Sequence, residues 1–140
     1  MVYLLAALGG ALGALARWTV AGALPRSPGG WPWATLLVNL TGCLLIGVLL
    51  AVLLARFPSS PWLRPFLATG VLGGYTTYST FAVDTVVLAD AGRPVAAAGY
   101  VLASVLGGAL AVVAGLLAGR AGVHAVDTVD AELVAGEGWS

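Results

Sequence analysis

Four apolar stretches, each long enough to cross a lipid bilayer, constrain this chain more than any other feature of its sequence. A helix of about 20 apolar residues spans the roughly 30 Å hydrocarbon core of a membrane. The stretches that reach this length are residues 2–24, 34–55, 66–89 and 95–117. Segments rich in proline and glycine separate them, as expected for loops. The sequence therefore predicts an all-α, multi-pass membrane protein with four transmembrane helices in one domain, residues 1–120.

Charged residues are scarce, which separates the chain from ordinary soluble domains. Only 9% of the 140 residues are charged, there is no lysine, and six arginines balance six acidic residues. A soluble domain carries about a quarter charged residues. The scarcity of charge leads us to expect the lipid bilayer as the surroundings of the chain. Because the chain has no basic cluster, we expect no nucleic-acid partner.

The spans also lack the residue sets that catalysis needs. Cys43 and His124 are the single cysteine and the single histidine, and they cannot build a Cys/His metal site by themselves. No pair of carboxylates and no Ser-His-Asp set lies within the spans. We therefore do not expect an enzyme.

The last 20 residues differ in charge from the spans. Residues 121–140 contain Asp127, Asp130, Glu132 and Glu137. We predict that this segment is an acidic, solvated and partly disordered tail.

The arginines give almost no preference for one orientation in the membrane. Arg56, Arg64 and Arg120 lie on the face that carries both termini, and Arg26 and Arg93 lie on the opposite face. Orientation follows the asymmetry of Lys and Arg, and three against two is a weak asymmetry. Either other signals orient the chain, or it inserts both ways and assembles as an antiparallel dimer. We favour the second interpretation.

Small residues recur at every fourth position in two spans. The fourth span has five such positions: Gly99, Ala103, Gly107, Ala111 and Gly115. The first span has Gly9 and Gly13 at the same spacing. Such ribbons let helix backbones approach closely. We interpret these ribbons as packing faces between helices. Four helices alone enclose little room for a polar pathway, which is a reason to expect an oligomer.

The third span is the least suited to a continuous helix. Residues 73–81 combine two adjacent glycines with hydroxyl and aromatic side chains at mid-membrane. Non-helical backbone at that depth is tolerated only where it is buried in protein or lines a cavity. The segment predicts either a break that presents carbonyls to an ion or a kinked helix whose hydroxyls bond the preceding turn.

Other polar residues in the spans suit an anion better than a cation. Arg17 either faces a polar interior or extends to the interface. Asn39 either lines a path or bonds a neighbouring helix, and Tyr100 with Ser104 offers hydroxyls one turn apart. Asp84 is expected near the water interface. The predicted interior is thus rich in hydrogen-bond donors and poor in carboxylates.

Three motifs together resemble one family. Residues 73–81, GGYTTYSTF, closely resemble the Gly-Gly-x-Thr-Thr-Phe-Ser-Thr-Phe signature of the Fluc (CrcB) fluoride channels. Residues 9–18, GGALGALARW, and residues 35–42, TLLVNLTG, look like the first-helix and second-helix motifs of that family. The resemblance extends over all four spans in order.

The resemblance implies a specific assembly and function. Fluc channels are antiparallel, dual-topology dimers of the bacterial inner membrane that export cytoplasmic fluoride passively and lower its toxicity. A structural sodium ion lies at the dimer centre, and here the backbone carbonyls of Gly73 and Thr76 would bind it. Arg17 would match a polar arginine of the first helix. The implied fluoride-pathway residues are Asn39, Tyr78, Ser79, Thr80, Phe81, Tyr100 and Ser104.

One residue departs from the family pattern. The family has two phenylalanines three residues apart, and here the first is Tyr78 while the second is Phe81. The tyrosine ring keeps an electropositive edge and adds a hydroxyl group. The change leaves open an alternative, in which the chain is one subunit of a heterodimer with a paralogous partner and its own pathway is silent. A small multidrug exporter is disfavoured because the first span has no carboxylate.

Overall fold

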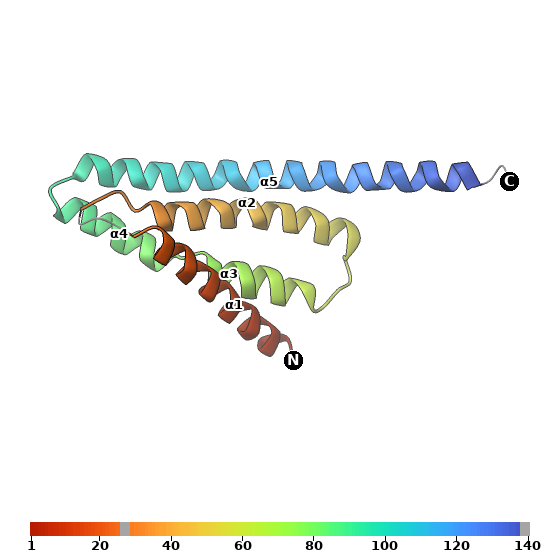
Figure 1. Cartoon of the computed structure of the whole chain (residues 1–140), viewed down its shortest axis with the longest axis horizontal. Coiled ribbons are helices and arrows are strands. Elements are labelled where there is room, and N and C mark those ends of the chain that lie inside the picture. Colours follow the sequence, from red (N-terminus) through yellow and green to blue (C-terminus); the bar gives the residue numbers. More distant parts are fainter. Residues whose placement is uncertain (26–28, 138–140) are drawn as a thin grey trace.

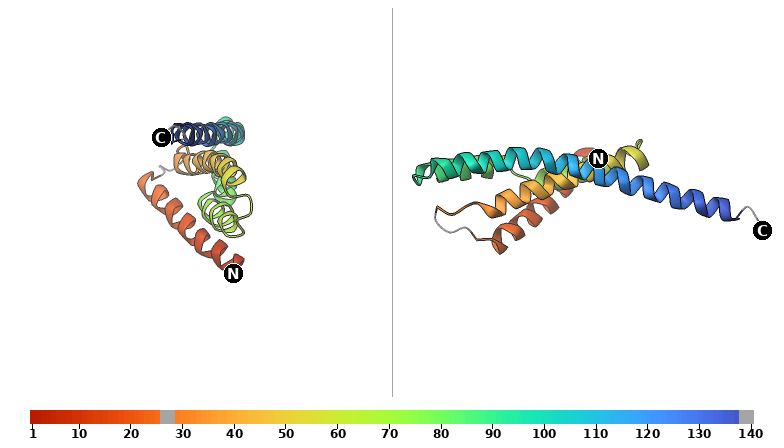
Figure 2. Two further views of the ribbon diagram at one scale, coloured as in Figure 1. Left: turned by 90° about the vertical axis from the view of Figure 1, so that its right-hand side faces the viewer. Right: turned by 90° about the horizontal axis from the view of Figure 1, so that it is seen from above.

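All described elements are helices, and two of them lie side by side along the longest axis of the molecule. The computed structural model describes residues 1–25 and 29–137. The elements in chain order are α1 (Val2–Ala23), α2 (Trp33–Arg56), η1 (Arg64–Leu72), α3 (Gly73–Tyr75), α4 (Tyr78–Asp90) and α5 (Pro94–Glu137). Helices α2 and α5 run next to each other, and α1 crosses the η1–α3 segment obliquely (Figures 1 and 2).

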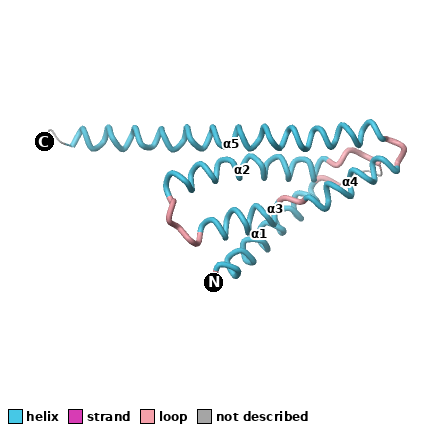
Figure 3. Tube along the Cα trace, turned by 180° about the vertical axis from the view of Figure 1, so that it is seen from behind, coloured by secondary structure: helices cyan, strands magenta, loops and turns pink. Residues whose placement is uncertain are grey.

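Three of these helices are long and apolar enough to span a membrane. They are α1, α2 and the part of α5 from Pro94 to Val129. Residues 66–89, predicted as one span, are divided among η1, α3 and α4, and each of these is too short to cross a bilayer alone. The loop that separates α3 from α4 is visible in Figure 3.

The C-terminal segment differs from its prediction. We predicted a partly disordered tail, but residues 121–137 continue α5 as helix, and residues 138–140 lie outside the described part. Alanine, leucine and glutamate favour helix in this segment, and no proline interrupts it. Arg56 also anchors it, because its Nη2 lies 2.8 Å from Asp127 Oδ1 and donates to the Val123 carbonyl at 3.3 Å.

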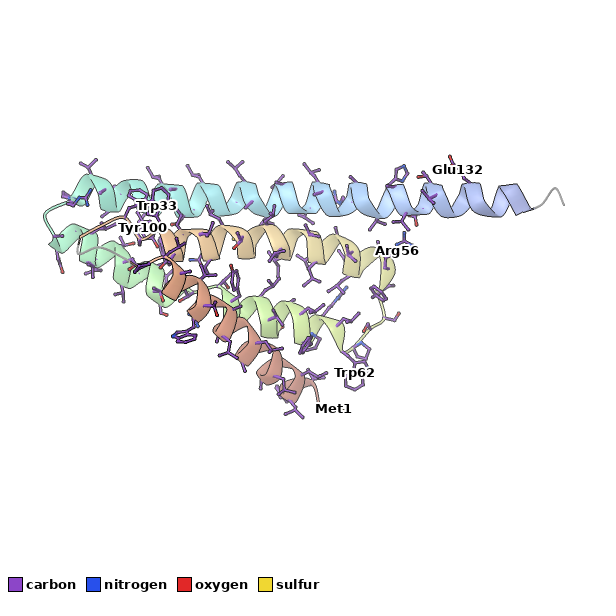
Figure 4. All side chains as sticks on the ribbon, in the orientation of Figure 1. Met1, Trp33, Arg56, Trp62, Tyr100 and Glu132 are labelled. Carbon is purple, nitrogen blue, oxygen red and sulfur yellow. The ribbon has the colours of Figure 1, made fainter. Side chains whose placement is uncertain are left out.

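The end of α5 nevertheless extends past the other helices. Figure 4 shows Arg56 at the end of α2, next to α5, and Glu132 farther along α5. The extension leaves Val126 and Val129 half-exposed. The tail is therefore a helical projection whose base contacts Arg56 of α2.

Glycines of the first span pack directly on η1 and α3. A Cβ added to Gly13 would meet the Val71 carbonyl and lie 2.7 Å from Tyr75 N, and one added to Gly74 would meet Gly10. The two backbones are therefore in contact, as the spacing of Gly9 and Gly13 predicts.

Glycines of α5 make a similar contact with α2. A Cβ on Gly115 would meet the Leu44 carbonyl, and one on Gly47 would meet the Val112 carbonyl. The small-residue ribbons thus pack helices within one subunit. They lend no support of their own to an oligomer, which must be argued from other surfaces.

A small buried cluster joins the beginning of α2 to α4 and α5. Its members are Leu36, Leu88, Ala97 and Tyr100, and both Leu88 and Tyr100 have no exposed surface. Large apolar side chains of α1, α2 and α5 point outward in numbers that a water-soluble surface does not carry. These exposed faces are suited to contact with lipid.

Candidate functional site

The candidate site is built around the two residues between α3 and α4. Thr76 (φ −75°, ψ 159°) and Thr77 (φ −149°, ψ 119°) are extended. The backbone thus leaves the helix for two residues at the middle of the GGYTTYSTF motif. Backbone groups near this interruption need hydrogen-bond partners other than those of a continuous helix.

Asn39 of α2 supplies two of these partners. Its Nδ2 donates to the Thr77 carbonyl at 3.0 Å, and the Thr77 N–H donates to Asn39 Oδ1 at 2.9 Å. The carboxamide therefore pairs with the Thr77 backbone through both of its polar atoms. An amide nitrogen has two N–H groups, so one N–H of Asn39 is not used by this pair.

Thr77 also begins helix α4 with its side chain. The Thr80 N–H donates to Thr77 Oγ1 at 3.2 Å, which is an ordinary N-cap bond. Thr77 Oγ1 donates to Thr80 Oγ1 at 3.0 Å, and it lies 3.3 Å from Ser79 Oγ. Three hydroxyl groups are thereby clustered at the start of α4.

These two sets of bonds leave specific carbonyls without their usual helical donors. In a continuous helix the N–H of residue i+4 bonds the carbonyl of residue i, so Thr77 N–H would bond Gly73 O and Thr80 N–H would bond Thr76 O. Here the first N–H bonds Asn39 and the second bonds the Thr77 side chain. The carbonyls of Gly73 and Thr76 are the two that the family resemblance implies as sodium ligands, and neutral oxygen ligands of this kind would fit a hard cation.

A cavity of about 460 Å³ adjoins the interruption. The predicted site residues that line it are Asn39, Gly73, Thr76, Tyr78, Phe81 and Ser104. No carboxylate is among the described residues that line it. The structure therefore brings together residues of α2, η1, α3, α4 and α5 around a space whose polar groups are neutral.

A second cavity, of about 270 Å³, contains the predicted basic residue. Arg17 lines it together with Thr35, Thr77 and Thr80. Thr77 lines both cavities, so the interruption separates them. Among the described residues Arg17 has no carboxylate partner, although the guanidinium is half-buried.

Aromatic rings form a row that leads away from the first cavity. The ring centroids of Tyr78 and Phe81 are 5.9 Å apart, and those of Phe81 and Tyr100 are 5.4 Å apart. Tyr78 is 81% exposed, whereas Tyr100 is fully buried. Tyr100 therefore lies behind Phe81 and does not line the cavity with Ser104, its predicted partner on α5.

Asp84 has a buried partner that the sequence did not indicate. We expected Asp84 near the water interface; within the subunit it is 7% exposed, and its Oδ2 accepts a hydrogen bond from Thr35 Oγ1 at 2.7 Å. The available signal was its spacing from Phe81 and Leu88, which puts the three on one face of α4. That face packs against the buried cluster.

A pair of hydroxyl groups, which the sequence did not indicate, joins α2 to Tyr75, the residue just before the interruption. Thr41 Oγ1 and Tyr75 OH are 3.0 Å apart, and Thr41 also donates to the Leu37 carbonyl at 2.7 Å. Asn39 and Thr41, two residues apart on α2, therefore contact Thr77 within the break and Tyr75 just before it.

The chain is similar to a known family along most of its length. Residues 4–116 match the family model described as CrcB-like protein, Camphor Resistance (CrcB).

Several named proteins are similar to the chain in sequence. The protein named fluoride-specific ion channel FluC from Paracoccus denitrificans is 49% identical over 118 residues, which cover 84% of this chain and 94% of that protein. A protein of the same name from Rhizobium meliloti is 46% identical over 119 residues, which cover 84% and 95%. Fluoride-specific ion channel FluC 2 from Streptomyces avermitilis is 48% identical over 98 residues, which cover 70% of this chain and 62% of that protein. The chain therefore belongs to the CrcB-like protein family.

Proposed function

We propose that this chain is the subunit of a fluoride-selective ion channel, which lets fluoride leave the cytoplasm passively and so lowers its toxicity. The observation that carries the proposal is the cavity of about 460 Å³ beside the helix interruption, whose lining combines neutral donors and aromatic rings with apolar residues and includes no described carboxylate. The relatives from Paracoccus and Rhizobium, at 49% and 46% identity, are named as fluoride-specific channels. The proposed activity is permeation, without a catalytic step.

Fluoride is small and strongly hydrated, so a narrow path must replace its water with hydrogen-bond donors. The donors proposed here are the second N–H of Asn39 and the hydroxyl of Ser104, which line the first cavity, together with the hydroxyls of Ser79 and Thr80 at the start of α4. The ring edges of Tyr78, Phe81 and Tyr100 carry partial positive charge and extend the path. Chloride is larger and is rejected by the width of such a path.

The exposed polar face argues for a dimer. Tyr78 is 81% exposed, and Ser79 and Thr80 are exposed next to it in the middle of the chain's membrane region. Hydroxyl groups and extended backbone at that depth need protein or a water-filled cavity around them. We propose that a second copy of the chain covers this face and completes the pathway.

The proposed topology has four crossings. We propose that η1, α3 and α4 together form the third crossing, with the interruption at Thr76 and Thr77 near its middle. The near balance of arginines between the two faces supports insertion in both orientations and an antiparallel pair. The cell (inner) membrane of a bacterium is the proposed location.

We further propose that sodium is a structural ion at the dimer centre. The support comes from the diverted N–H groups of Thr77 and Thr80, because the carbonyls of Gly73 and Thr76 thereby lack their usual i+4 donors. Four such carbonyls, two from each subunit, would meet around one cation in a symmetric pair. The ion would join the two subunits and neutralise the carbonyl dipoles.

A heterodimer is the alternative. Tyr78 replaces the expected phenylalanine at an exposed position that a partner must cover, and the relative from Streptomyces carries the number 2 in its name. Both facts fit a chain that pairs with a paralogous subunit and whose own pathway is silent.

Fluoride efflux from liposomes that contain only this protein tests the proposal. Fast fluoride efflux without chloride leak is expected of a self-sufficient channel. If folded protein releases no fluoride alone but does so together with a paralogous subunit, the heterodimer replaces the homodimer. If neither preparation releases fluoride, the channel function is refuted.

A further inference from the structure

The indole N–H of Trp31 is a buried hydrogen-bond donor without an acceptor among the described residues. Its indole Nε1 is inaccessible to solvent and bonds none of the described residues. Trp31 lies in the segment just before α2, and its ring packs against the buried cluster around Tyr100. A buried donor without a partner is costly and calls for an explanation, such as a bound ion.

The ring of Trp31 continues the aromatic row of the candidate site. The centroids of Trp31 and Tyr100 are 5.8 Å apart and the rings are nearly perpendicular, at 86°. Together with Phe81 and Tyr78, the row has centroid spacings of 5.9, 5.4 and 5.8 Å. It therefore runs without a gap from the first cavity to Trp31.

A third cavity lies at the Trp31 end of this row. It has a volume of about 500 Å³ and is lined by Trp31, Trp33 and Thr35, together with residues of the chain between α1 and α2. Figure 4 shows the labelled Trp33 and Tyr100 at this end of the molecule. The aromatic row thus joins the cavity beside the interruption to a cavity at the end of the helices.

We propose that the Trp31 indole N–H is a fluoride-binding subsite at the outer end of the pathway, an inference that rests on the proposed channel function. The anion would accept a hydrogen bond from Nε1 after passing the ring edges of Phe81 and Tyr100. An indole nitrogen is a donor only, so it binds an anion and offers nothing to a cation.

Asp84 limits how tightly this subsite binds. The carboxylate also lines the third cavity and accepts a hydrogen bond from Thr35. A nearby negative charge weakens fluoride binding, and weak binding suits conduction because an ion must leave each site as readily as it enters.

Two measurements on the full-length protein test the subsite. In ¹⁵N-tryptophan-labelled protein, the indole N–H resonance that disappears in Trp31→Phe should shift downfield and saturably with sodium fluoride, but not with sodium chloride. In liposomes, Trp31→Phe keeps the ring but loses the N–H, and should lower fluoride efflux about tenfold. Trp62→Phe is the matched control, because this indole is 45% exposed and lies between α2 and η1, outside the three cavities, and it should behave like the unchanged protein.

The two readouts separate this inference from the channel proposal. A Trp31 resonance that ignores fluoride overturns the subsite, whether or not the protein conducts. Unchanged efflux through Trp31→Phe also overturns it and leaves the channel intact. If the protein conducts only together with a paralogous subunit, it can still show a saturable, fluoride-specific shift of the Trp31 resonance. That result supports the subsite, and the efflux of Trp31→Phe is then measured in the two-subunit channel.

Discussion

Asn39 joins the two functions that the site needs, because its carboxamide both holds the interrupted backbone and faces the cavity. Its Oδ1 accepts the Thr77 N–H at 2.9 Å, and its Nδ2 donates to the Thr77 carbonyl at 3.0 Å. From the sequence, a structural hydrogen bond and a pathway role were alternatives for this residue. The structure shows Asn39 in a backbone pair and also in the wall of the cavity, so the observed structural bond is compatible with the proposed pathway role.

Asn39→Asp should abolish fluoride conduction. The carboxylate has the shape of the amide, but it cannot donate to the Thr77 carbonyl and it carries the charge of the permeant ion. A like charge about 4 Å away costs about 4 kcal/mol at an effective dielectric of about 20, so efflux should fall about 100-fold or more.

Liposome efflux measures this effect, with size-exclusion chromatography as the check on folding. Ser59→Asp is the matched control, because it adds the same charge at an exposed loop position and should conduct normally. Normal efflux through folded Asn39→Asp protein would remove Asn39 from the pathway.

At the scale of the element, helix packing here depends on backbone contact more than on interlocking side chains. Gly9 and Gly13 of α1 pack on η1 and α3, and Gly115 of α5 packs on α2. In lipid there is little hydrophobic force between helices, so close packing supplies much of the attraction. The interrupted segment is therefore held on one side by α1 and on the other by Asn39.

Gly13→Ala should destabilise the subunit. The added Cβ would meet the Val71 carbonyl and lie 2.7 Å from Tyr75 N, and backbone atoms cannot move aside as a side chain can. Overpacking of this kind costs about 1–3 kcal/mol, which should lower the midpoint of thermal unfolding in detergent.

Gly22→Ala on the same helix is the matched control. A Cβ added there meets no atom within 4 Å, so the midpoint should stay the same or rise slightly because alanine favours helix. Equal midpoints for the two variants would contradict the packing argument.

The whole molecule presents a surface that is apolar on most sides and polar at one place. Large apolar side chains are exposed along α1, α2 and α5, whereas Tyr78, Ser79 and Thr80 are exposed together at the start of α4. Lipid covers the first kind of surface and cannot cover the second. A single subunit is therefore incomplete in a membrane, which is the physical reason to propose a pair.

Insertion in both orientations can be measured at the exposed turn between α4 and α5. In a Cys43→Ser background, Ala91→Cys should react with a membrane-impermeant thiol reagent from each side of the cell membrane in about half of the molecules, because the arginine counts are nearly balanced. Labelling of more than about nine tenths from one side would refute dual topology.

A variant with two added positive charges in the loop between α2 and η1 is the matched comparison for this labelling experiment. Ser59→Lys with Ser60→Lys changes the count from three against two to five against two, and should concentrate labelling on one side. Antiparallel pairs then become rare, so fluoride efflux should fall in parallel with the loss of mixed orientation.

The sequence by itself determined the class of protein, its family and most of the polar residues at the site. Long continuous apolar stretches identify membrane spans without any knowledge of how the helices pack. The reason is that the hydrocarbon core of a membrane requires apolar side chains and a backbone whose hydrogen bonds are made internally. The GGYTTYSTF motif also indicated where a helix would be weak, and the hydroxyl and amide side chains that line the cavity come from that motif and from Asn39 and Ser104.

Only the tertiary structure decided how the polar groups are paired. The burial of Asp84 against Thr35, the pairing of Asn39 with Thr77 and the contact of Trp31 with Tyr100 each join residues far apart in sequence. Such pairs depend on how helices cross, and the crossing depends on glycine contacts that fix distance and angle together. The helical continuation of α5 past residue 120 likewise contacts Arg56 of another helix through Asp127, a pairing that local composition alone cannot reveal.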